Sequence, residues 1–274
     1  MNSLRLISDN AALRAANSCV TTNSLFPISQ LLTDIKSEFW RTTSTSAQII
    51  SVLPAAESVS CVALPINNFS NATTMRVRLY SDVGGTNLLL DSADASCIAT
   101  RERPPAHEVI GSAGFQYGFG RYATRFFLET PNVRRVVIDI TDSGNSQGFL
   151  EAAFLVIGKY HALEKNFDLG ATVGWKSGTQ LSNNDSGDNL TFPSWKRKAV
   201  TFDLSSASSS ERNGFFNLFL GNGSEHPTFI SCFPENASME KEEQFTIYGR
   251  LAPESELKLT TCTRFTTSLQ INSL

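Results

Sequence analysis

A chain of 274 residues has room for about two ordinary domains, and 41% hydrophobic residues, with 19 Phe among them, can fill real cores. A formal net charge of −3 argues against a nucleic-acid-binding surface, which would need a basic excess on one face. No run approaches the ~18 apolar residues of a membrane helix, and residues 1–10 lack the apolar core of a signal peptide. Charged residues are only 18%, and two explanations fit equally: partners cover the surface, or Ser, Thr and Asn replace charges on exposed strands.

The cysteines are odd in number and widely spaced, without a C-x-x-C or metal-type cluster. They are Cys19, Cys61, Cys97, Cys232 and Cys262. Thiols inside apolar or alternating strand patterns usually behave as small buried hydrophobes. We therefore expect reduced cysteines and synthesis in a reducing cytoplasm.

The N-terminal part of the chain changes from irregular to alternating. Residues 1–37 show no sustained period, and we interpret them as an arm or lead-in strand. Predicted strands follow at 47–53, 59–66, 74–80 and 88–90. Met75, Val77 and Leu79 point one way, as in a half-buried strand, because side chains alternate with a period of two. Residues 61–66 hardly alternate, which is typical of a strand covered on both faces.

A long connection and three further strands complete this first unit. Residues 93–120 form a loop with alternating glycines and aromatic residues, and a loop of this length is usually functional or poorly ordered. Strands are predicted at 122–129, 133–141 and 149–158, and the turn at 142–145 predicts a hairpin between the last two. Strands joined by turns favour an antiparallel sandwich or jelly roll over a doubly wound α/β fold.

A second unit begins near residue 163. Residues 167–175 alternate and precede a predicted polar loop at 177–189. Ser208 and Glu211 form a capping box that opens the one predicted helix, at about 208–220. The remaining strands are predicted at 198–204, 228–233, 244–251, 257–264 and 267–271. The expected domains are therefore a lead-in at 1–37, a sandwich at 38–162 and a smaller β-rich domain with one helix at 163–274.

Several motifs resemble the minor tail proteins of long-tailed bacteriophages. In the first unit these are Trp40-Arg41-Thr42-Thr43 and Met75-Arg76-Val77-Arg78-Leu79-Tyr80-Ser81-Asp82. In the second unit they are Asn166-Phe167-Asp168-Leu169-Gly170-Ala171 and Tyr248-Gly249-Arg250-Leu251. The resemblance implies a galactose-binding-like N-terminal sandwich and a structural, homo-oligomeric virion component of the tail tip or baseplate. Its implied partners are the tail tube, the hub and neighbouring copies of itself.

Catalysis has little support in the sequence. His107, His161 and His226 occupy unrelated loops, and no H-E-x-x-H, G-x-S-x-G or P-loop pattern occurs. Asp82 and Asp91 are the best calcium candidates, but their spacing matches no known loop motif. We therefore expect no enzyme activity, no cofactor and no metal.

Sugar binding is the alternative function, because sandwiches of this type bind sugars in loops at one end with aromatic faces and hydrogen-bonding side chains. The candidate ligand or partner contacts are Trp40, Arg41, Tyr117, Phe119, Arg121 and Tyr122. For Trp40, core packing is the favoured alternative. Tyr117 and Phe119, in the glycine-rich loop, dock on a neighbouring subunit or are exposed for a ligand. Lys196, Arg197 and Lys198 are interpreted as a solvated strand edge, with a buried salt-bridge interface as the second interpretation.

Overall fold

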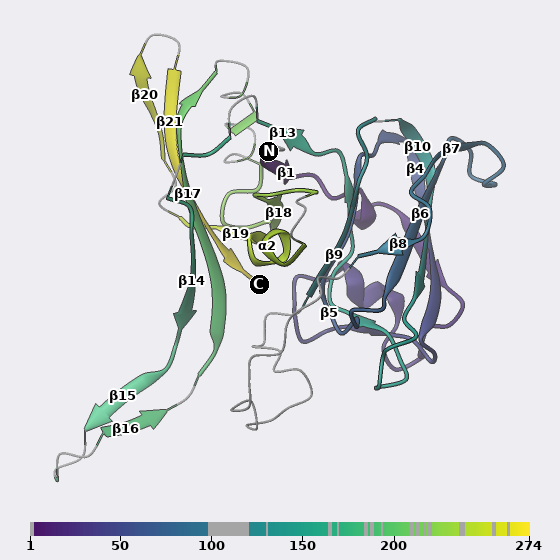
Figure 1. The fold of residues 1–274 in the computed structure, drawn as a ribbon, viewed down its shortest axis with the longest axis horizontal. Helices are drawn as coiled ribbons and strands as arrows, with labels where there is room; N and C mark the ends of the chain where they lie inside the picture. Colours follow the sequence, from purple (N-terminus) through teal and green to yellow (C-terminus); the bar gives the residue numbers. More distant parts are fainter. Residues whose placement is uncertain are drawn as a thin grey trace.

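The computed structural model describes residues 3–274 apart from 98–120, 130, 164–165, 169, 184–185, 187–188, 193, 209–210, 212–213, 216–217, 219–220, 236–238, 254–255 and 262–263. Every strand pairing within this part of the chain is antiparallel. Figure 1 shows a two-sheet sandwich beside a larger, twisted sheet. The prediction of a mainly β, antiparallel fold is confirmed.

Two sheets form the sandwich. One is six-stranded and contains β2 (Ala16–Cys19), β4 (Ser46–Ser58), β10 (Asn132–Thr141), β6 (Thr74–Tyr80), β7 (Leu88–Asp91) and β8 (Ala95–Ser96). The other is five-stranded and contains β12 (Val156–Gly158), β5 (Cys61–Asn67), β11 (Glu151–Ala152), β3 (Trp40–Arg41) and β9 (Arg121–Phe126). The short helices η1 (Ala11–Leu13) and η2 (Ile28–Leu32) pack against this sandwich.

The sandwich core is built from side chains that alternate along its strands, so that every second residue points inward. Met75, Val77 and Leu79 of β6 are fully buried in it, as predicted. Strand β5 is buried on both faces, also as predicted. Its residues Val62 and Leu64 enter the sandwich core, whereas the alternate residues on its other face enter a second cluster against the larger sheet. The continuous apolar run in β5 therefore serves two cores.

The predicted hairpin across residues 142–145 is wrong. Strand β10 pairs with β4 and β6, whereas β11 and β12 pair with strands of the opposite sheet. The fully buried Asp142 accepts hydrogen bonds from the backbone N–H of Ser70 (2.8 Å) and Gly144 (3.2 Å) and from the Ser70 hydroxyl. These bonds tie the turn to the loop after β5, and the chain crosses from one sheet to the other.

The second unit is an eight-stranded sheet. Its strands are β13 (His161–Ala162), β1 (Arg5–Ile7), β18 (Thr228–Ser231), β19 (Thr246–Leu251), β21 (Arg264–Ser273), β17 (Lys196–Ala207), β14 (Thr172–Ser177) and β20 (Glu256–Thr261). The predicted polar loop at 177–189 is wrong, because it contains β15 (Gln180–Asn183), which pairs with β16 (Asn189–Phe192) in a separate hairpin. Neighbouring Lys196 and Arg197 are exposed as predicted, but Lys198 is buried and donates to the carbonyls of Glu243 and Thr246.

The predicted helix start is confirmed. The backbone N–H of Ser208 donates to Glu211 Oε2 (2.7 Å), and the Glu211 N–H donates to the Ser208 hydroxyl (3.4 Å), which is the reciprocal bonding of a capping box. A short helix that the sequence did not predict, α2 (Met239–Gln244), precedes β19. In the described part of the chain, no helix is long and apolar enough to cross a membrane.

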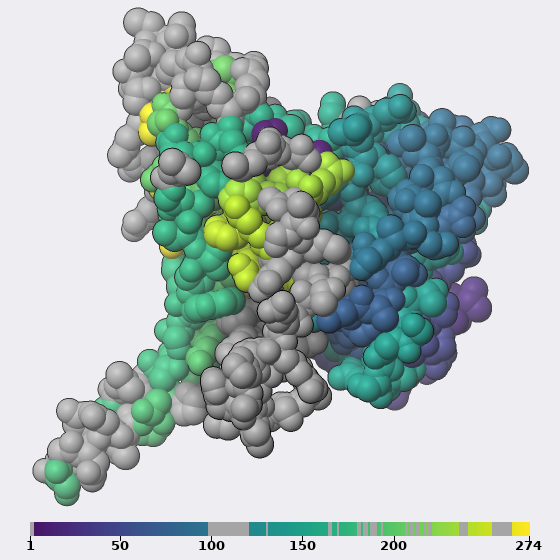
Figure 2. Space-filling model, viewed as in Figure 1, coloured from purple at the N-terminus to yellow at the C-terminus, as the bar shows by residue number. Residues whose placement is uncertain are grey.

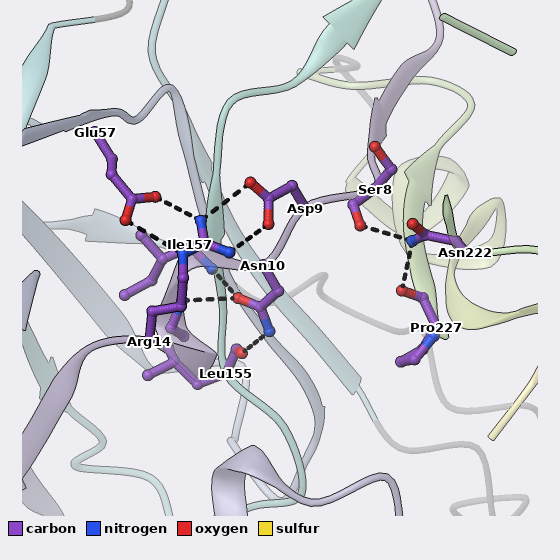
Figure 3. A network of polar contacts seen from close by, with 10 residues as sticks. Ser8, Asp9, Asn10, Arg14, Glu57, Leu155, Ile157, Asn222 and Pro227 are labelled. Carbon is purple, nitrogen blue, oxygen red and sulfur yellow. Dashed lines mark hydrogen bonds and ion pairs between the residues drawn. The ribbon is translucent and has the colours of Figure 1, made fainter. Parts of the chain in front are cut away.

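The N-terminal segment joins both units (Figure 3). Strand β1 lies in the eight-stranded sheet and β2 in the sandwich. Between them, Asn10 donates to the carbonyl of Leu155 (2.8 Å) and accepts from the Ile157 N–H (3.0 Å). On the other side, Asn222 donates to the carbonyl of Ser8 (2.6 Å). Residues predicted as a lead-in therefore form a strap between the two units.

The described cysteines Cys19, Cys61, Cys97 and Cys232 are free thiols. Burial raises the pKa of Cys97 and of Cys232 to about 12 and that of Cys61 well above its usual value. A thiol with that pKa is only about one part in 10⁴ thiolate at pH 8. Cys19 is half-buried.

We expect Cys19 to be the reactive thiol of this set. In a Cys262→Ser background at pH 8, Ellman's reagent should modify Cys19 rapidly and the three buried thiols only after unfolding. Removing Cys19 should abolish the fast phase. Rapid modification of Cys97 or Cys232 in the folded protein would contradict this burial.

Candidate functional site

Trp40 packs in the sandwich core. It has no exposed surface, so its apolar ring is packed entirely inside the protein. Its indole N–H donates to the Thr22 hydroxyl (3.0 Å), so its polar group also has a partner inside the protein. The structure therefore favours the core-packing interpretation over a ligand contact.

Tyr122 packs at the junction between the two units. Only 6% of it is exposed, and its hydroxyl accepts from the Tyr248 N–H (3.4 Å). The Lys198 ammonium lies 5.4 Å from its ring centroid. Burial raises the pKa of the phenol, as expected for a group in an apolar contact. Tyr122 thus joins the sandwich to the eight-stranded sheet.

Arg121 fixes a loop at one end of the sandwich. It donates to the carbonyl of Phe69 (3.0 Å) and to Asn71 Oδ1 (2.7 Å). Tyr117 and Phe119, the other predicted contacts, lie outside the described residues. Trp40 and Arg121 lie in one row across the five-stranded sheet, because Trp40 pairs with Ala152, Ala152 with Asn67 and Asn67 with Arg121. With strands about 4.8 Å apart, their Cα atoms are roughly 15 Å apart.

Arg41 has the richest surroundings of the predicted contacts. Its Nε and Nη2 both donate to Glu151 Oε2, at 3.1 and 2.8 Å. Its guanidinium carbon lies 4.4 Å from the ring centroid of Phe26, 5.2 Å from that of Phe39 and 4.2 Å from that of Phe149. Phe26 and Phe39 stack on each other at 5.1 Å. Arg41 and Glu151 are each 27% exposed, so the ion pair reaches solvent.

Amide side chains extend this arrangement. Asn68 accepts from the Glu151 N–H (2.8 Å) and donates to Gln147 Oε1 (2.8 Å) and to the carbonyl of Phe149 (3.0 Å). Leu25, next to Phe26 in the chain, is 77% exposed. We call Arg41, Glu151, Asn68 and the three phenyl rings around Arg41 the Arg41 cluster.

Strand geometry explains why these groups gather. Arg41 and Trp40 are neighbours in β3, so they point to opposite faces: Trp40 into the core and Arg41 out of it. Glu151 lies directly opposite Arg41 in β11 and therefore shares its face. Two of the three aromatic rings, Phe26 and Phe149, come from outside the local sequence around Arg41. Of the three rings, only Phe39, which directly precedes Trp40-Arg41, gave a signal in the sequence.

The calcium candidates have other roles. The Asp91 carboxylate binds the Arg76 guanidinium, and this ion pair lowers the pKa of Asp91. The Asp82 carboxylate accepts from the N–H groups of Thr86 and Asn87, and these bonds lower its pKa to about 2. Within the described residues, no group of three or more His, Cys, Asp or Glu side chains is arranged to hold a metal ion.

Comparison with protein-family models and with curated proteins gives no match. Solved structures similar to this chain include a family 32 carbohydrate-binding module of NanJ from C. perfringens in complex with galactose: 14% identity, 56% of this chain, 98% of that chain and TM-score 0.39. A fucose-binding module from Streptococcus pneumoniae has 11% identity, covers 56% of this chain and 99% of its own, and has a TM-score of 0.37. A chitosan-binding module from Paenibacillus sp. IK-5 has 14% identity, 55% and 99% coverage and a TM-score of 0.37. At these identities the similarity concerns the fold alone.

Proposed function

We propose that the sandwich is a carbohydrate-binding module that binds a sugar at the Arg41 cluster. The observation that carries this proposal is the partly exposed Arg41–Glu151 pair among three phenyl rings. Sugar hydroxyls both donate and accept hydrogen bonds, and the pair offers a donor and an acceptor side by side. The C–H face of a sugar is apolar and matches an aromatic ring. Binding of this kind alters no covalent bond of the sugar.

We further propose that the protein is part of a virion. It would be a structural component of a bacteriophage tail tip that contacts host surface glycans. The resemblance to minor tail proteins supports this placement between tail tube and hub. The two-unit architecture supports it as well, because the cluster lies on the sandwich and leaves the eight-stranded sheet available for neighbouring tail proteins. Incorporation of the tagged protein into purified particles, located by electron microscopy, would test this role.

Arg41→Gln should weaken binding of the best glycan from an array by about 10–100-fold, because a charge-assisted hydrogen bond contributes about 1.5–3 kcal/mol. Isothermal titration would measure the affinity, and thermal unfolding would confirm that the variant is folded. Arg76→Gln is the matched control, since Arg76 also forms a part-exposed ion pair in the sandwich, with Asp91. No glycan binding by the wild-type protein, or equal affinity of Arg41→Gln and wild type, would refute the proposed sugar site.

A further inference from the structure

The hairpin β15–β16 and the adjoining ends of β14 and β17 form an arm that projects from the body of the protein. Figure 1 shows this arm running down and away from the eight-stranded sheet, and Figure 2 shows its described residues, in green, standing clear of the sandwich. Register pairs Ser177 with Lys196 and Gln180 with Phe192 along it. We call residues 172–198 the β-arm.

Exposed aromatic residues concentrate on the β-arm. Trp175 is 55% exposed, Phe192 55% and Trp195 53%. Trp195 is held in place by the chain opposite: the Gly178 N–H donates to its carbonyl (2.9 Å), and a Cβ on Gly178 would lie 2.7 Å from Cε2 of its ring. The Arg197 guanidinium lies 5.2 Å from the Trp195 ring centroid. Large, fixed, exposed aromatic side chains are typical of the centre of a protein interface.

The β-arm also presents a strand edge. Among the described strands, β14 pairs only with β17, so the peptide groups on its outer edge face away from the sheet. An open edge is a template for another strand. The sandwich has a comparable edge at β7, which within the described residues pairs only with β6. Exposed aliphatic residues lie on β7 and in the turn before it: Leu88 is 50% exposed and Leu89 40%, and Val83 in the turn is 46% exposed.

The charges of these two surfaces are complementary. The β-arm exposes the three basic residues Lys176, Lys196 and Arg197, whereas Lys198 is buried; with the two Asp of the β-arm the net charge is 3 − 2 = +1. The whole chain carries −3, which leaves −3 − 1 = −4 for the rest. Residues 82–94, around β7, contain three Asp and no basic residue, although Arg76 and Arg135 bind part of this segment. A basic aromatic arm therefore fits an acidic aliphatic edge.

The two surfaces lie at opposite ends of the molecule's longest axis (Figure 1). The β-arm of one molecule cannot reach its own β7 edge, but it can reach that of another. We propose that the β-arm docks on the β7 edge of a second copy of this chain, in a head-to-tail contact. Contacts of this type close into a ring when the rotation between copies permits it. This proposed contact rests on the tail-tip assembly role proposed above. It does not involve the Arg41 cluster and is therefore separate from sugar binding.

Sedimentation equilibrium of the full chain over a concentration series tests the contact. The wild-type protein should self-associate, and Trp175→Ser/Phe192→Ser should weaken association at least about tenfold, because exposed aromatic anchors dominate interfaces. Leu88→Lys should do the same by placing a positive charge opposite a basic arm. Leu128→Lys is the matched control, since Leu128 is 84% exposed and lies on neither surface. Circular dichroism would confirm that each variant is folded.

Mixing the two defective variants distinguishes this contact from others. A mixture of the arm variant with Leu88→Lys retains one intact arm and one intact β7 edge, so it should form a 1:1 dimer and nothing larger. A monomeric wild-type protein, unchanged association of either variant, or a mixture that stays monomeric would overturn the proposal. Loss of glycan binding in the arm variant would contradict the separation of the two sites. Self-association that neither variant weakens would refute these surfaces and leave the tail-tip role standing.

Discussion

Trp40→Ala is expected to lower the free energy of unfolding by about 3–5 kcal/mol, the usual cost of removing a fully buried Trp side chain. Trp40 has no exposed surface and sits where β3, η2 and β11 meet. The substitution opens a cavity and leaves the Thr22 hydroxyl without its indole donor. Urea unfolding followed by fluorescence or circular dichroism would measure the loss.

The matched control is Trp175→Ala, because Trp175 is 55% exposed. This change should alter the free energy of unfolding by no more than about 0.5 kcal/mol. Equal effects of the two substitutions would show that Trp40 is not a core residue. Glycan affinity per folded molecule should change far less in Trp40→Ala than in Arg41→Gln.

Gly158→Ala is expected to destabilise the protein by about 1–3 kcal/mol, the cost of forcing an extra methyl group into a packed site. An added Cβ would lie 2.6 Å from the carbonyl oxygen of Asp9 and 2.9 Å from Ile7 Cγ2. Both belong to the strap, so the substitution should also loosen the N-terminal segment. Hydrogen exchange of residues 5–14 should quicken together with the fall in melting temperature.

Gly174→Ala is the control for this prediction. Gly174 also lies in a strand, but a Cβ there meets no atom within 4 Å. Its substitution should leave the melting temperature within about a degree or two of the wild type, corresponding to a few tenths of a kcal/mol. If Gly158→Ala were equally harmless, the strap would not pack tightly against β12.

Candidate site residues were predictable only in part. Arg41 was identified as a hydrogen-bonding side chain next to Trp40, but its partners come from residues 26, 39, 149 and 151. No local pattern links Glu151 to Arg41, which are 110 positions apart in the chain. Tyr122 looked like a ligand contact because the sequence does not show which strands receive a second unit on their outer face. Tyr248 of that unit covers it.

The sequence by itself determined the long alternating strands and the faces they bury, but not β1, β2 or β15. Side chains alternate along a strand whatever it pairs with, so Met75, Val77 and Leu79 marked a core face without any knowledge of their neighbours. The Ser208–Glu211 capping box was readable for the same reason, since both partners are local. Only the tertiary structure decided the pairing of strands, the crossing at Asp142, and the division of the N-terminal segment between β1 and β2. Pairing depends on contacts between residues far apart in sequence, and these contacts are set by the packing of whole sheets.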